Sequence, residues 1–134
     1  MSCNAAIYTV NNTPTAILAA GTVPLGTVIR RFGCALQLSG DGITIGAPGY
    51  YDVDVNLTVQ PTAAGPVTAT LFKDGVAVPG AIATSTAAAA GDSVNLNINA
   101  LVRQSGCCAG LSTLTVQLSA AATITNAAIV VEKV

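Results

Sequence analysis

The sequence predicts an all-β domain, a two-sheet antiparallel sandwich or jelly roll of about eight to ten strands. Apolar and polar residues alternate with a period of two in many short segments, as in strands that bury one face. Turn residues, chiefly Gly, Pro, Asn and Asp, separate these segments at short intervals. The best helix candidate, residues 87–90, is a run of four alanines and too short to form a stable helix unaided, so we expect a loop there.

Strand segments in the first half of the chain are bounded by such turns. Asn12-Thr13-Pro14 divides the first two segments, and Ser39-Gly40-Asp41-Gly42 bends the fourth. The expected strands are residues 5–12, 15–21, 26–32, 35–45 and 49–59.

Residues 49–59, GYYDVDVNLTV, place Tyr51, Val53 and three further apolar residues on one face. Asp52 and Asp54 share the other face, where their carboxylates could contribute to a calcium site. Calcium takes six to eight oxygen ligands, however, and the remaining acidic residues lie in distant segments or in turns. We therefore interpret the two aspartates as an outward acidic face that discourages edge pairing, and we predict no metal site.

The second half begins with a loop at residues 60–65 and a predicted hairpin at residues 66–80. In that hairpin, Asp74-Gly75 joins two β-rich runs at the two-residue spacing that favours a type I′ turn. Residues 93–102 then alternate between apolar residues and asparagines, and residues 112–120 repeat the pattern. Residues 123–134 are more continuously apolar, which is typical of a strand covered on both faces.

The composition predicts a component of an assembly. The chain is 51% hydrophobic and only 8% charged, whereas typical domains carry about 25% charged residues. A single subunit with so few charges would expose apolar patches that favour association.

Several functions are excluded by what the sequence lacks. The net charge is −1 and the five basic residues are scattered, so we expect no nucleic-acid partner. Turn residues interrupt every apolar window, so we expect no membrane span, and the first residues lack the pattern of a secretory signal. The chain contains no His, which removes the common general base and metal ligand. We therefore predict no enzymatic activity and no cofactor.

The four cysteines show no metal-binding spacing. Cys107 and Cys108 are adjacent, whereas Cys3 and Cys34 are distant in sequence. Buried or loop thiols are the favoured interpretation, and a disulfide formed after release from the cell, or a metal site, are the alternatives. The sequence does not determine the redox state of Cys107 and Cys108.

The stretch APGYYDVDVNLTVQPTAAGPVTATLFKDGVAVPGA, residues 47–81, resembles the tumour-necrosis-factor and complement-globular-head jelly rolls. It resembles above all their small bacteriophage, prophage and bacterial members, which include the C-terminal domains of spore-surface collagen-like glycoproteins. The resemblance covers residues 26–134 as the jelly-roll domain. Residues 1–25 are expected to add one or two strands, either to the same domain or as an attachment to a capsid or other partner.

The resemblance implies a ten-stranded jelly roll that assembles as a homotrimer. It places Tyr51 at the family's core aromatic beside the threefold axis, and we group five residues as trimer-interface or core positions. These residues are Tyr51, Val53, Val94, Leu96 and Ile98. The aromatic-glycine-leucine ending of the animal members is replaced by AAIVVEKV, so animal-type calcium and receptor sites are not transferred.

The function that the resemblance implies is a structural protein of a bacteriophage virion, a trimeric capsid decoration or head-fibre protein at the capsid surface. Such a protein is synthesised in the host cytoplasm without a signal peptide, and its partners are its own copies and the capsid or other virion proteins. The alternative is a trimeric tip of a phage or spore-surface fibre that binds a host-surface glycan or protein. A spore-coat structural protein is a third hypothesis.

Overall fold

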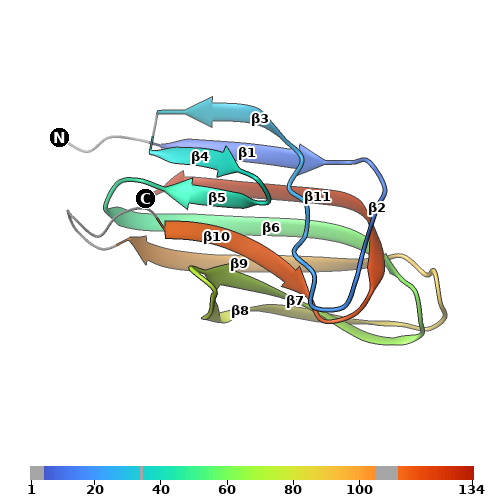
Figure 1. Ribbon diagram of the computed structural model, residues 1–134. Coiled ribbons are helices and arrows are strands. Elements are labelled where there is room, and N and C mark those ends of the chain that lie inside the picture. The colour runs from blue at the N-terminus through green and yellow to red at the C-terminus, as the bar shows by residue number, and fades with distance from the viewer. Residues whose placement is uncertain (1–4, 34, 105–111) are drawn as a thin grey trace.

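A computed structural model describes residues 5–33, 35–104 and 112–134, and eleven strands form two antiparallel sheets there, with no helix among them (Figure 1). The first six strands are β1 (Ala6–Asn11), β2 (Thr15–Ile17), β3 (Thr27–Phe32), β4 (Leu36–Ser39), β5 (Gly42–Ile45) and β6 (Gly49–Pro61). The remaining five are β7 (Gly65–Lys73), β8 (Val76–Ala87), β9 (Val94–Gln104), β10 (Ser112–Leu118) and β11 (Ala122–Lys133). The predicted all-β sandwich is therefore confirmed.

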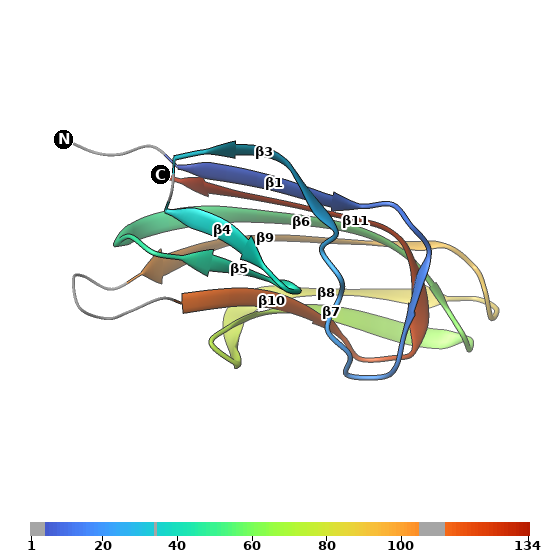
Figure 2. The same cartoon turned by 45° about the horizontal axis from the view of Figure 1, so that its top comes forward.

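The two sheets face each other as layers, which Figure 2 shows in a second view. Sheet A has the strand order β3-β1-β11-β6-β9, with β2 also pairing with β11. Sheet B has the order β4-β5-β10-β7-β8. Neighbours in each sheet are mostly distant in sequence, as in a jelly roll.

Three expected segments differ from the observed strands. Residues 35–45 form two strands, β4 and β5, because the chain reverses at Gly40 and Asp41. Residues 15–21 form a strand only as far as Ile17, because a turn follows in which the amide of Gly21 donates to Leu18 O at 2.9 Å. β8 continues to Ala87, well past the predicted end of the hairpin, so the loop expected at residues 87–90 begins only at residue 88.

The Asp74-Gly75 hairpin between β7 and β8 is confirmed. Asp74 and Gly75 have φ angles of 53° and 79°, as a type I′ turn requires. The turn is also tied to β10, since the amide of Asp74 donates to Thr113 O and the amide of Thr113 donates to Asp74 Oδ1, both at 2.9 Å.

The hydrophobic core lies between the sheets and follows the alternation that the sequence shows. In β6, Tyr51, Val53 and Val59 are fully buried, and β7 and β10 contribute Leu71 and Val116 from the opposite sheet. Burying one such aliphatic side chain contributes roughly 1.5–3 kcal/mol before the loss of chain entropy is counted.

The whole of β1 pairs with residues 127–132 of β11, so residues 5 and 134 lie at the same end of the molecule (Figure 1). β1 and β2 both pair with β11, which places residues 6–17 within sheet A. The described residues contain no helix of the length and hydropathy needed to span a bilayer.

Candidate assembly surface

The residues predicted as trimer-interface or core positions point into the sandwich. Tyr51 and Val53 of β6 have no exposed surface, and Leu96 and Ile98 of β9 are 1% and 3% exposed. Val94, at the start of β9, is half-buried and packs against the same core. Because side chains alternate along a strand, contacts of sheet A with another molecule must come from the intervening residues.

Tyr51 combines a buried ring with a polar anchor. Its hydroxyl donates a hydrogen bond of 2.7 Å to Ala47 O in the segment that leads into β6. Burial disfavours the charged phenolate and raises the pKa of Tyr51 above the ordinary 10.0. The tyrosine is therefore a neutral donor that fixes the start of β6.

The outer face of sheet A carries the outward side chains of β1, β3, β6, β9 and β11. Strand register aligns them in rows that cross the sheet. One such row consists of Arg30, Tyr8, Val130, Asp54 and Asn99.

Asparagines and one aspartate form a polar track along β6 and β9 on this face. The amide of Asn99 donates to Asp54 Oδ1, and Thr58 Oγ1 donates to Asn95 Oδ1 at 3.0 Å. Asn56 lies opposite Asn97 between these two pairs. Cross-strand pairs of this kind hold the register of a sheet while leaving hydrogen-bonding groups on the surface.

Apolar side chains flank the polar track. Tyr50 and Leu101 are 51% and 59% exposed at one side, and Phe32 of β3 is 62% exposed at the other. Ala128 and Val130 of β11 are only half-buried, although the sequence predicts this strand to be covered on both faces. The outward side of β11 lacks that cover in a single chain.

Two depressions hollow the outer face. One of about 480 Å³ lies over the polar track beside Tyr8 and Val130, and one of about 360 Å³ lies toward β3 beside Arg30 and Phe32. All six residues of β3 are exposed, including Val28 and Ile29, so this edge strand is open to contact. The surface is suited to binding a complementary protein surface.

The acidic residues of β6 lie on this outer face, as predicted, and Asp54 has an asparagine as its partner. Among the described residues, no group of three or more His, Cys, Asp or Glu could hold a metal ion. All four cysteines, Cys3, Cys34, Cys107 and Cys108, lie outside the described residues.

Sequence reasoning named the buried face of β6 and β9 and missed the exposed apolar residues on the opposite face. Tyr50 and Leu101 carry a signal that could have identified them, because each is apolar at a position where its own strand is otherwise polar outward. Phe32 carried no such signal, because only the position of β3 at the sheet edge exposes it.

Comparison with known proteins identifies the fold. No protein-family model matches the chain, and no curated protein matches it in sequence. A crystal structure of murine APRIL is similar, with a TM-score of 0.76 and 11% identity over 98% of this chain and 100% of that one. PRD1 vertex protein P5 has a TM-score of 0.66 and 17% identity, with coverage of 97% and 96%. The globular domain of zebrafish complement 1qA has a TM-score of 0.65 and 12% identity, with coverage of 95% and 94%.

These structures share a jelly roll of the tumour-necrosis-factor and complement C1q type. The resemblance inferred from residues 47–81 is therefore confirmed at the level of the fold.

Proposed function

We propose that this protein is a non-enzymatic structural protein of a bacteriophage virion, a homotrimeric capsid decoration or head-fibre protein on the particle surface. The structural likeness to PRD1 vertex protein P5 carries the proposal, since it extends over 97% of this chain and that protein is named as a vertex protein. The few charges of the chain and its lack of His are consistent with a structural role.

The trimer is proposed to form through the outer face of sheet A. That face offers exposed apolar residues, a half-buried central strand and an exposed edge strand within one continuous sheet. A specific interface buries about 800 Å² on each partner, an area that a whole sheet face can supply. The amide groups of the polar track would form hydrogen bonds with the neighbouring copy and so fix the relative position of the two subunits. A buried amide that lacks a hydrogen-bond partner would destabilise the interface.

The five core candidates have an indirect role in this proposal. The core would support β6 and β9 on their inner face, and the outward residues of the two strands would make the contact between copies. The core residues meant are Tyr51, Val53, Val94, Leu96 and Ile98.

The decisive experiment is to locate the protein in particles. Phage particles purified from a lysate that expresses this gene are analysed by quantitative mass spectrometry and by labelling with an antibody against the protein. We expect stoichiometric copies in multiples of three per vertex or facet, with antibody bound to intact particles. Absence from purified particles would contradict the virion role.

The receptor- or glycan-binding alternative predicts a different result. A tip protein would be present in few copies at the end of a fibre, and the purified protein would bind host cells and block infection. A decoration protein would be abundant on the shell and would leave adsorption unchanged when it is added in excess.

A further inference from the structure

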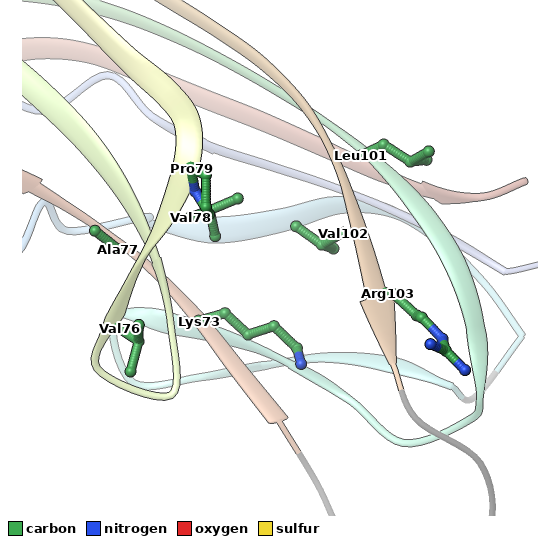
Figure 3. A pocket seen from close by; sticks show the side chains of 8 residues that line it. All are labelled: Lys73, Val76, Ala77, Val78, Pro79, Leu101, Val102 and Arg103. Atoms are coloured by element: carbon green, nitrogen blue, oxygen red, sulfur yellow. The ribbon is translucent and has the colours of Figure 1, made fainter.

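A second surface feature lies where the two sheets meet at their β8 and β9 edges, and it shares the exposed residue Leu101 with the outer face of sheet A. A groove of about 370 Å³ runs between the hairpin end of β7 and β8 and the last residues of β9 (Figure 3). Pockets for small ligands span about 300–1,000 Å³, so the groove is within that range.

A bulge in β8 creates the groove. Thr70 pairs with Ile82 but Phe72 pairs with Ala77, so residues 78–81 stand opposite the single residue Leu71. Pro79 has no N–H to donate, and Gly80 adopts a φ of 79°, so this stretch is unsuited to regular pairing. The bulge turns the edge of sheet B and exposes the apolar stretch that lines the groove.

The lining of the groove is apolar between the two strands. Val78 and Val102 extend toward each other from β8 and β9, and Pro79 lies beside Val78 (Figure 3). Leu101 is 59% exposed and adds apolar surface at the rim.

The charge at the groove is entirely positive. Lys73 extends from β7 toward β9, whereas the side chain of Arg103 leaves β9 near the same end of the groove on the side away from Lys73 (Figure 3). They are two of the five basic residues of the chain, and no acidic residue lines the groove. Among the described residues, Lys73 and Arg103 have no ion-pair partner. Asp74 follows Lys73 in the chain, but its carboxylate accepts a hydrogen bond from the amide of Thr113.

We propose that this groove binds an amphipathic anion, a ligand that carries a carboxylate or sulfonate on an apolar body. The apolar body would lie against Val78 and Val102, and the anionic group would lie near Lys73 with additional attraction from Arg103. Because the groove is open to solvent along its length, each cation contributes a screened interaction of about fivefold in affinity. The proposal does not depend on a virion role, since it concerns only groups within one chain.

The test uses the assembled full-length protein and the fluorescent probe anilinonaphthalenesulfonate. We expect saturable binding that octanoate displaces and that octanol displaces at least tenfold less effectively. Inorganic phosphate should not displace the probe at the same concentration, because it lacks the apolar body.

The matched variants are K73Q with R103Q and, as the control, R31Q with K133Q, which lie opposite the inward residues Ile7 and Tyr51 and outside the outward rows of sheet A. The first pair removes both cations of the groove and should weaken probe and octanoate binding by at least tenfold. The control pair removes the same charge elsewhere and should leave binding unchanged. Unfolding curves in urea establish that both pairs are folded.

A third variant, V78D, tests the contact between Val78 and the apolar body of the ligand. An acidic group at this position of the bulge should repel the carboxylate of octanoate and abolish its binding while the fold is retained. The proposal is overturned if the probe does not bind saturably, if the two variant pairs bind equally, or if octanol displaces the probe as well as octanoate. Exclusion of the probe because a second copy covers the groove would overturn it too.

Discussion

Tyr51 is the residue at which the local chemistry of this protein is most clearly defined. Its ring is fully buried in an interior that is otherwise almost entirely aliphatic, and its hydroxyl has one partner, Ala47 O. Burial also raises the pKa of Tyr51, because the apolar interior accommodates the neutral phenol and disfavours the charged phenolate.

We predict that Tyr51→Phe lowers the free energy of unfolding by about 1 kcal/mol at pH 7, because one hydrogen bond to a buried carbonyl is lost. The effect should depend on pH. In the unfolded chain the phenol ionises near pH 10, below its pKa in the folded protein, so the stabilisation is complete below pH 10 and declines as pH rises through the folded pKa. The difference between wild type and variant should therefore shrink above pH 10 in urea unfolding experiments.

Tyr50→Phe is the matched control, because the neighbouring side chain is 51% exposed. It should change stability by less than about 0.5 kcal/mol at pH 7. Equal effects of the two substitutions would contradict the assignment of Tyr51 as a buried donor.

Gly26 is required by close packing of the backbone. Its φ is +78°, and a Cβ atom there would overlap Val10 O and lie 2.7 Å from Asn11 Cα. Both neighbours belong to the backbone of β1, so they cannot move away as a flexible side chain could.

Gly26→Ala should therefore destabilise the protein by more than about 2 kcal/mol. Gly40→Ala is the control, since Gly40 also has a positive φ, +58°, but has open space around its Cα. That variant should cost only about 1 kcal/mol of backbone strain. Thermal unfolding of both variants measures the difference, and similar losses would mean that backbone strain alone explains Gly26.

At the scale of elements, the turn of the β7-β8 hairpin follows from its local sequence and also makes a tertiary contact with β10. Asp74 adopts a positive φ of 53°, which Asp and Asn tolerate better than other non-glycine residues. The same side chain accepts a hydrogen bond from Thr113 at the start of β10. The turn thereby joins three strands of sheet B and not only two.

We predict that Asp74→Ala destabilises the protein by about 1–2 kcal/mol, because it removes the bond to Thr113 and leaves alanine with an unfavourable φ. Asp74→Asn should restore most of the loss, since it keeps an Oδ1 acceptor and the turn propensity. Urea unfolding of the two variants tests this. A loss in Asp74→Asn as large as in Asp74→Ala would show that the negative charge, and not the turn geometry, is what matters.

The strands themselves illustrate which elements sequence patterns can define. The period-two patterns of β6, β9 and β10 predicted the strands and their buried faces, because each strand has one face against the core. β3 was predicted as a strand at residues 26–32, but its exposure on both faces was not, and the bulge of β8 was not predicted. β3 lies at an edge where both faces are exposed, and the bulge depends on how Pro79 and Gly80 meet Leu71 across the sheet.

At the scale of the whole molecule, the proposed trimer is a hypothesis about the outer face of sheet A. The mass of the chain is 13.2 kDa, so light scattering after size-exclusion chromatography should give about three times that value at micromolar concentration. A mass equal to one chain would contradict the trimer.

Val130→Glu should shift this equilibrium toward monomer by at least tenfold, because it places a charge in the centre of the proposed interface beside Asp54. Ile82→Glu is the control, since Ile82 is 57% exposed on β8 in the other sheet. It should leave the oligomeric state unchanged. Dissociation by Ile82→Glu alone would place the interface on sheet B.

The sequence by itself determined the all-β class, the buried faces of β6, β9 and β10 and the Asp74-Gly75 turn, because alternation and turn propensity depend on near neighbours along the chain. Only the tertiary structure decided which strands became edges, and hence that every residue of β3, including Phe32, is exposed. Exposure of that kind depends on the order of strands in a sheet. That order arises from long-range pairing, such as β1 with β11, which no local pattern encodes.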